Sequence, residues 1–194
     1  MNRILLFGAL AALVFLAGCA HEDTHHKIII STTDQRMFVL QDNVKIAEFP
    51  VSTSKFGEGD QRGSNDTPLG LLKIKQKIGS NAPAGAVFKS RRRTGEVIVP
   101  DAPGRDPIVT RILWLEGMES HNRNAFSRCI YIHGTPEERN IGTPASYGCI
   151  RMKSADVIVL YETVGVGARV LITTRSYLPP PSPPPVAAAT VPSL

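Results

Sequence analysis

Short apolar runs separated by turn-forming residues dominate the chain. The runs are rich in Ile, Val, Leu and Phe, and Gly, Pro, Asp and Asn stand between them. Asp42 and Asn43 join two such runs and predict a hairpin turn, because both residues tolerate the backbone angles of turns. The pattern predicts strands over residues 27–31, 37–40, 44–52, 69–75, 96–99, 110–115 and 128–133.

One later segment has the period of a helix. Ser154 is placed to cap its first turn and Asp156 to favour the positive end of the helix dipole. Gly165 or Gly167 is placed to end it, and a last strand follows over 168–173. We therefore expect a mostly β fold with one main helix. The apolar residues at i, i+3, i+4 and i+7 are Val157, Leu160, Tyr161 and Val164.

The first residues have the form of an export signal. Arg3 precedes an apolar run over 4–17, which is too short to span a bilayer and has the length of a secretory signal. The sequence Leu16-Ala17-Gly18-Cys19 resembles a bacterial lipobox, in which the cysteine thiol is acylated. We expect a signal peptide over 1–18 and lipidation of Cys19; the alternative is an ordinary secretory signal with an incidental cysteine. Ala20, where Asp would favour retention in the inner membrane, favours an outer-membrane, periplasmic lipoprotein.

Two further segments lie outside the expected domain, which covers 27–177. Residues 19–26 form a short polar tether with three histidines, which could hold a metal but are expected to be an exposed linker. Residues 178–194 are rich in proline and cannot bury a core, so we expect a disordered tail.

Composition and charge limit the class of protein. The 194 residues carry 22 basic and 17 acidic side chains, with 42% hydrophobic residues, which fits one globular domain and excludes a fully disordered chain, a coiled coil and a polytopic membrane protein. The basic residues are scattered rather than clustered with aromatics, so we expect no nucleic-acid partner. The one dense run, Arg91–Arg93, is interpreted as a solvated loop rather than an anion-binding patch.

The candidate chemistry lies between His133 and Cys149. A cysteine nucleophile needs a base, and His133 ends an apolar run that would fix its backbone. A neighbouring imidazolium would pull the thiol pKa well below its usual value. Gly148 precedes the cysteine and leaves room for a substrate to approach backbone N–H groups. The alternative, a buried structural cysteine, fits poorly with a loop position beside a glycine and a charged residue.

These residues resemble the L,D-transpeptidases of bacterial cell walls, with their YkuD-type catalytic domain. The family signature is His-Gly followed some residues later by Ser-x-Gly-Cys-(apolar)-Arg, and here it is His133-Gly134 with Ser146-Tyr147-Gly148-Cys149-Ile150-Arg151. A second family feature, Thr-Pro-x-Gly before an apolar strand, matches Thr67-Pro68-Leu69-Gly70. The resemblance covers about 27–173, and only 91–106 matches no family element.

The resemblance implies a β-sandwich of mixed sheets with one main helix and no cofactor or metal. It implies an enzyme that attacks the tetrapeptide stems of peptidoglycan, releases D-Ala and forms 3→3 crosslinks. Cys149 would be the nucleophile and His133 the general base, oriented by the carbonyl of Gly134. The backbone N–H groups of Gly148 and Cys149, with Tyr147, would form the oxyanion hole. Arg151 and Ser146 would hold the stem, although a structural ion pair is an equal alternative for Arg151.

Other interpretations of the same residues stay open. Water as acyl acceptor gives an L,D-carboxypeptidase, and a protein amine gives an enzyme that attaches or releases lipoproteins. Two more distant alternatives are a zinc site and a non-catalytic wall-binding lipoprotein. We also expect Cys129 and Cys149 to be free thiols, too far apart for a disulfide, and 119–124 is a candidate lid. The zinc site would use His121, Cys129, His133 and Cys149.

Overall fold

The computed structural model describes residues 22–178. The expected signal peptide over 1–18, the lipidation site Cys19 and the proline-rich segment 179–194 lie outside the described residues. Within 22–178, no helix is long and apolar enough to cross a membrane.

Within residues 22–178 the domain has ten strands and one α-helix, where the apolar pattern predicts eight strands and one helix. The helix α1 covers Ser154–Thr163, and two short 3-10 helices cover Ser120–Asn122 (η1) and Glu138–Asn140 (η2). The strands are β1 (His26–Ser31), β2 (Arg36–Gln41), β3 (Val44–Pro50), β4 (Gly70–Ile78), β5 (Ala86–Lys89), β6 (Arg92–Val97), β7 (Ile108–Gly117), β8 (Tyr131–Gly134), β9 (Ile150–Met152) and β10 (Arg169–Thr173).

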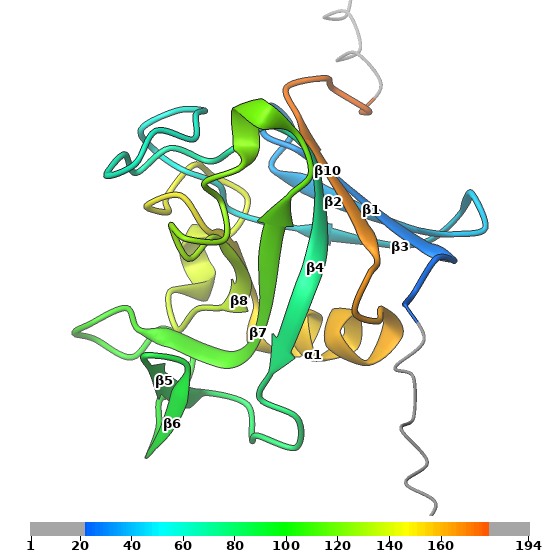
Figure 1. The fold of residues 1–194 in the computed structure, drawn as a ribbon. Coiled ribbons are helices and arrows are strands. Elements are labelled where there is room, and N and C mark those ends of the chain that lie inside the picture. The colour runs from blue at the N-terminus through cyan, green and yellow to red at the C-terminus, as the bar shows by residue number, and fades with distance from the viewer. Residues whose placement is uncertain (1–21, 179–194) are drawn as a thin grey trace, which may run out of the picture.

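The strands form one mixed, hydrogen-bonded sheet. Its order is β3-β2-β1-β10-β4-β7-β5-β6. In addition, β8 pairs with β7, and β9 pairs with β8. The pairs β1–β10 and β8–β9 are parallel and the others antiparallel. Figure 1 shows β4 and β7 side by side through the middle of the domain, with β1–β3 crossing at an angle on one side. The expected mostly β fold with one main helix is confirmed.

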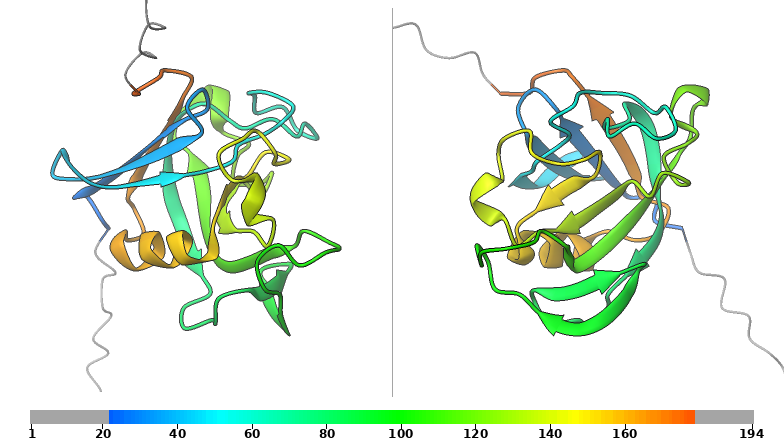
Figure 2. Two further views of the ribbon diagram at one scale, coloured as in Figure 1. Left: turned by 180° about the vertical axis from the view of Figure 1, so that it is seen from behind. Right: turned by 90° about the vertical axis from the view of Figure 1, so that its left-hand side faces the viewer.

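The main core lies between the strands of this sheet and the helix α1. It joins side chains of β1, β2, β4, β7–β10 and α1 in one apolar cluster. The helix packs against β7 and β8, and Figure 2 shows it below the strands. Its predicted apolar face, which includes Val157 and Leu160, is fully buried. This packing fixes β8 and β9, the two short strands that border the candidate site.

The basic run Arg91–Arg93 is exposed, as expected, but it forms part of a hairpin and not a loop, so β6 begins earlier than predicted. Arg92 and Arg93 start β6, while Ser90 and Arg91 form the turn from β5 with φ values of +49° and +65°. Two-residue hairpin turns need such left-handed angles, which Asn-Gly would signal and Ser-Arg does not. Arg91 lies over the Trp114 ring, 4.6 Å from its centroid. The sequence therefore hides a hairpin, β5–β6, that was not predicted.

Ser154 does not cap α1, contrary to prediction. Lys153 occupies the capping position without a side-chain cap bond. The N–H of Ser154 instead donates to Oε1 of Glu138 at 2.7 Å, which places a carboxylate at the positive end of the helix. A residue distant in sequence thus replaces the local cap.

In the described part of the tether, residues 22–26, Asp23 and His26 are held against the domain, whereas Glu22, Thr24 and His25 are exposed as expected. The Asp23 carboxylate accepts hydrogen bonds from the N–H of Gly165 at 2.6 Å and of His26 at 3.0 Å. His26 begins β1, and the His25 ring pairs with Asp42 at 2.9 Å. Asp42 and Asn43 form the predicted turn, with φ values of +48° and +67°.

Candidate active site

The parallel pairing of β8 and β9 brings the two candidate catalytic residues together. In register, His133 pairs with Arg151, and Ile132 with Ile150. Cys149 directly precedes β9, so it arrives beside Tyr131 near the start of β8. His133 and Cys149 line one cavity of about 140 Å³, here called the Cys149 cavity. Its lining residues are Asp106, Ile108, His133, Ser146, Tyr147, Cys149 and Arg151.

The ring of His133 is held in one orientation. Its Nδ1 lies 2.8 Å from the carbonyl oxygen of Gly134. A carbonyl only accepts, so Nδ1 carries the proton and Nε2 keeps a lone pair that can take one. The expected contact between His133 and Gly134 is present. The fixed tautomer is the one that a general base needs.

The thiol of Cys149 is hydrogen-bonded to backbone. The N–H of Tyr131 donates to Sγ at 3.4 Å, and the S–H donates to the carbonyl oxygen of Cys129 at 3.4 Å. Cys129 stands before β8 with a φ of +59°, so the strand predicted from residue 128 starts at 131 and Cys129 is not part of it. The two cysteines are free, yet the expectation that Cys129 is distant from the nucleophile is wrong.

Burial keeps both groups neutral. Desolvation lowers the pKa of His133 to about 4, opposed by its bond to Gly134, and raises the pKa of Cys149 to about 11. The positive charge of Arg151 disfavours imidazolium and favours thiolate, but it does not outweigh burial. The expected lowering of the thiol pKa by an imidazolium is therefore wrong. At neutral pH the site holds a thiol and a neutral imidazole.

The loop before Cys149 is shaped by Ser146 and Gly148. Ser146 is fully buried, and its Oγ donates to the carbonyl of Cys149 at 2.5 Å and accepts from the N–H of Gly148 at 3.2 Å. Gly148 has a φ of +112°, and a Cβ there would lie 3.1 Å from the carbonyl oxygen of Asp66. The N–H groups of Tyr147 and Cys149 form no hydrogen bond with other residues of 22–178. These two N–H groups are free to donate to an oxyanion.

Arg151 forms an ion pair at the wall of the cavity. Its Nη2 lies 2.6 Å from Oδ2 of Asp106, and its Nη1 lies 3.9 Å from Oε2 of Glu137. The side chain is 10% exposed, so its charge is largely neutralised within the protein. The structural alternative for Arg151 is thus observed, and its role in holding a stem stays a prediction.

The comparisons with known proteins agree with this arrangement. The family model described as the L,D-transpeptidase catalytic domain, YkuD, matches residues 25–172. The chain belongs to this family. The match covers β1 to β10 and includes both motifs identified in the sequence.

Among curated relatives, the probable L,D-transpeptidase YbiS of Escherichia coli K12 is 25% identical over 156 residues, which is 77% of this chain and 45% of that protein. The putative L,D-transpeptidase YqjB of Bacillus subtilis is 52% identical over 42 residues, 22% of this chain and 24% of that protein. The chain spans less than half the length of these relatives.

Solved structures support the fold. An L,D-transpeptidase from Mycobacterium smegmatis has a TM-score of 0.50 at 18% identity, over 76% of this chain and 58% of that one. L,D-transpeptidase 3 from Mycobacterium tuberculosis, solved with a faropenem-derived adduct, has a TM-score of 0.50 at 18% identity, over 77% of this chain and 60% of that one.

Several residues around the YkuD signature were not found from the sequence. Asp106 lies in the segment that matches no family element, and its ion pair with Arg151 is set by tertiary contact alone. Phe56 lies against Tyr147 with ring centroids 5.4 Å apart. Lys55 stands 4.4 Å from the centre of the Tyr147 ring. No local pattern marks Lys55 and Phe56, because β-bridges from Ser52 to Arg151 and from Ser54 to Ser146 bring their segment to the site.

Of the four residues of the zinc alternative, Cys129, His133 and Cys149 lie near one another, but His121 lies apart from them. His121 lies beside Glu119, with 3.6 Å between Nε2 and Oε2, and does not line the Cys149 cavity. Among residues 22–178, no group of three or more metal-ligating side chains is present. The candidate lid 119–124 is fastened, since Asn122 is buried and its amide donates to the carbonyls of Leu69 and Leu71 at 3.0 Å.

Proposed function

We propose that the protein is a peptidoglycan L,D-transpeptidase that works through an acyl-enzyme on Cys149. The observation that carries the proposal is the β8–β9 register, which puts His133 and Cys149 in one cavity with the histidine already in the tautomer of a base. Membership of the YkuD family supports peptide stems as the substrate.

Acylation begins with a neutral thiol and a neutral imidazole. The S–H leaves the carbonyl of Cys129 and turns into the cavity, where Nε2 of His133 takes the proton as Sγ attacks the carbonyl carbon of the third stem residue. The N–H groups of Tyr147 and Cys149, free in the described residues, stabilise the oxyanion. When the C–N bond breaks, the imidazolium gives its proton to the departing D-Ala amine.

Deacylation uses the same groups in reverse. An amine of a second stem attacks the thioester carbon, passes a proton to Nε2 of His133, and the thiol leaves with that proton. The product is a 3→3 crosslink, and no cofactor enters these steps. Water in place of the amine gives a tripeptide, so the acceptor decides between the transpeptidase and the alternative L,D-carboxypeptidase.

The test is incubation of the purified protein with a disaccharide-tetrapeptide, followed by mass analysis of the products. We expect a dimer that lacks one D-Ala. Accumulation of tripeptide monomer alone would assign the protein to the carboxypeptidases, and an unchanged substrate would overturn the proposed chemistry. A variant with Cys149→Ala serves as the control for contaminating enzymes.

We further propose that the domain is held at the outer membrane by lipid on Cys19. Residues 22–26 leave the domain beside the turn that follows α1, where Asp23 binds Gly165. Labelling of cells with a palmitate analogue tests this. We expect labelled wild type and unlabelled Cys19→Ala, and label on neither would leave the segment an ordinary secretory signal.

A further inference from the structure

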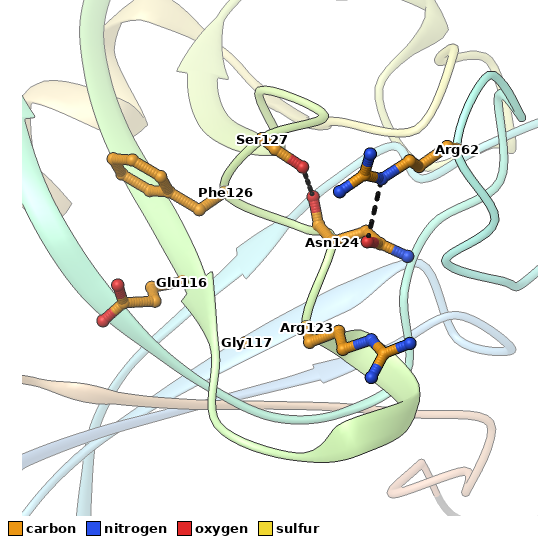
Figure 3. Close-up of a pocket in the computed structure, with 7 residues that line it drawn as sticks. All are labelled: Arg62, Glu116, Gly117, Arg123, Asn124, Phe126 and Ser127. Atoms are coloured by element: carbon orange, nitrogen blue, oxygen red, sulfur yellow. Dashed lines mark hydrogen bonds between the residues drawn. The ribbon is translucent and has the colours of Figure 1, made fainter.

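A second cavity, of about 690 Å³, lies outside the candidate active site. Its lining comes from the loop between β3 and β4, the end of β7 and the segment between η1 and β8, as Figure 3 shows. We call it the Arg62–Arg123 cavity. Its lining residues are Arg62, Glu116, Gly117, Arg123, Asn124, Phe126 and Ser127.

The cavity carries uncompensated positive charge. Neither Arg62 nor Arg123 forms an ion pair within residues 22–178. Arg62 uses Nε for a bond to Oδ1 of Asn124 at 3.4 Å, which leaves its two terminal nitrogens as free donors. The one acidic lining residue, Glu116, lies 3.4 Å from both Lys73 and Lys75, so its charge is already satisfied. Two free guanidinium groups favour a carboxylate or another planar anion.

The two walls are joined rigidly beneath the cavity. Arg128 and Asp60 form a buried ion pair at 2.8 Å, with side chains 6% and 3% exposed. The other oxygen of Asp60 accepts from the N–H of Asn124 at 2.6 Å, so the ion pair ties the loop of Arg62 to the segment of Arg123. The backbone of both walls is therefore fixed before a ligand enters, so binding orders the two exposed arginine side chains and not the loops that carry them.

The cavity is linked to the nucleophile by the same arginine. Arg128 donates to the carbonyls of Ser64 at 3.1 Å and Asp66 at 2.7 Å. The Asp66 carbonyl is the group that Gly148 approaches, one residue before Cys149. On the other side, Phe126 stacks on Trp114 at 4.0 Å, and Trp114 contacts Tyr131, whose N–H reaches Sγ of Cys149.

We propose that the Arg62–Arg123 cavity binds a carboxylate-bearing peptide, the second stem that supplies the acceptor amine. This inference rests on the proposed function, because a crosslinking enzyme must hold two stems at once. The one basic side chain that lines the Cys149 cavity, Arg151, is already paired with Asp106. That cavity therefore offers no free cation for a carboxylate of the second stem. The free guanidinium groups supply one.

Trp114 gives a binding readout that does not depend on activity. It is the one tryptophan of the sequence and stacks on the cavity residue Phe126. In a Cys149→Ala background, we expect the disaccharide-tetrapeptide to change its fluorescence saturably. R62Q/R123Q should raise Kd about tenfold or more, since each lost charge-assisted contact is worth about one factor of ten. R92Q/R93Q, which removes the same charge from exposed positions on β6, should leave Kd unchanged.

Two further titrations identify the chemical class of the ligand. A stem with all carboxyl groups amidated should bind no better to the parent than to R62Q/R123Q, and vesicles of phosphatidylglycerol should leave the fluorescence unchanged. Equal binding of the peptide by R62Q/R123Q and its parent, equal binding of the amidated stem, or arginine-dependent binding of vesicles alone would each overturn the proposal. Thermal melting checks that the variants are folded.

The active protein gives the matching kinetic test. With Cys149 present, R62Q/R123Q should be acylated at the wild-type rate, form several-fold less dimer and release more tripeptide, because water then outcompetes the amine. A slower acylation with an unchanged dimer-to-tripeptide ratio would contradict an acceptor site. If the wild type forms no dimer but still binds the peptide through both arginines, the crosslinking function fails while the cavity remains a carboxylate site.

Discussion

The two cavities of this domain handle charge in opposite ways. In the Cys149 cavity, about 140 Å³ in volume, Arg151 is paired with Asp106, and burial keeps His133 and Cys149 neutral. In the Arg62–Arg123 cavity, about 690 Å³ in volume, two exposed guanidinium groups form no ion pair with any residue of 22–178. A buried free charge is costly, whereas an exposed one is not. We infer that the domain separates proton transfer from recognition of anions.

The largest effect is expected for Cys149→Ala. This change removes the reactive sulfur from the neutral cavity, so turnover should fall by about 10³-fold or more. Product analysis with the disaccharide-tetrapeptide measures it, and circular dichroism checks the fold. Cys129→Ser is the matched control, because Sγ of Cys149 donates to the backbone carbonyl of Cys129, which this substitution keeps. Turnover by the alanine variant, or its loss in the serine variant alone, would move the nucleophile away from Cys149.

The next effect is expected for His133→Ala, with a loss of about 10²–10⁴-fold in turnover. The imidazole is the proposed base in this cavity, and the one carboxylate that lines it, Asp106, is paired with Arg151 and accepts from the hydroxyl of Thr135. The double variant with Cys149→Ala should be no worse than Cys149→Ala alone, since base and nucleophile act as one unit. Additive losses in steady-state kinetics would show that the two residues act independently.

The support of the Arg62–Arg123 cavity is tested by Asp60→Asn. The change leaves the buried Arg128 without its counter-charge, so the free energy of unfolding should fall by about 3–5 kcal/mol. Urea unfolding measures the loss. Lys45→Ala, which breaks an exposed pair with Glu48, should cost less than about 1 kcal/mol. Equal losses for the two variants would mean that the buried pair does not hold the cavity walls.

A smaller effect is expected at the junction between the cavities. Gly148→Ala puts a Cβ 3.1 Å from the carbonyl oxygen of Asp66 at a φ of +112°. We expect a loss of about 1–3 kcal/mol in unfolding free energy, with slower acylation because the loop of Cys149 must shift. Gly95→Ala, also at positive φ but with open space around it, separates backbone strain from the clash. Identical behaviour of the two variants would exclude a role for the clash.

Local patterns predicted most of the fold. The apolar run in 27–31 and the helical period from Val157 to Val164 both depend on residues close in sequence, and both elements are present. The hairpin of β5 and β6 was missed because Ser90 and Arg91 adopt left-handed angles that their residue types do not signal. The three-residue strand β9 is too short to show a period, and its partner β8 is distant in sequence.

In the candidate site, too, the features set by local sequence were predicted and those set by tertiary contacts were not. His133, Gly134 and Cys149 stand in a motif that can be read from the sequence, and the bond from His133 to Gly134 is local. The pKa values of the pair could not be predicted, because they follow from burial by elements spread over the chain. The Arg62–Arg123 cavity was missed for a similar reason, since its two arginines belong to loops joined only by Asp60 and Arg128.

The claim that a neutral thiol and a neutral imidazole carry the chemistry is tested most directly by the pH dependence of acylation. A carbapenem is mixed with the protein, and intact-protein mass gives the rate of adduct formation on Cys149. The pKa of His133 is lowered to about 4, so the base stays unprotonated above that value, and the pKa of Cys149 is raised to about 11, so free thiolate is scarce below it.

We therefore expect a rate that is level from about pH 5.5 to about pH 9 and falls in acid with a midpoint near the lowered pKa of His133. In His133→Gln, the rate should rise about tenfold per pH unit, because thiolate must then form without a base. A wild-type rate that rises with a midpoint near the ordinary histidine value of about 6.5, or an adduct mapped to Cys129, would contradict the neutral pair.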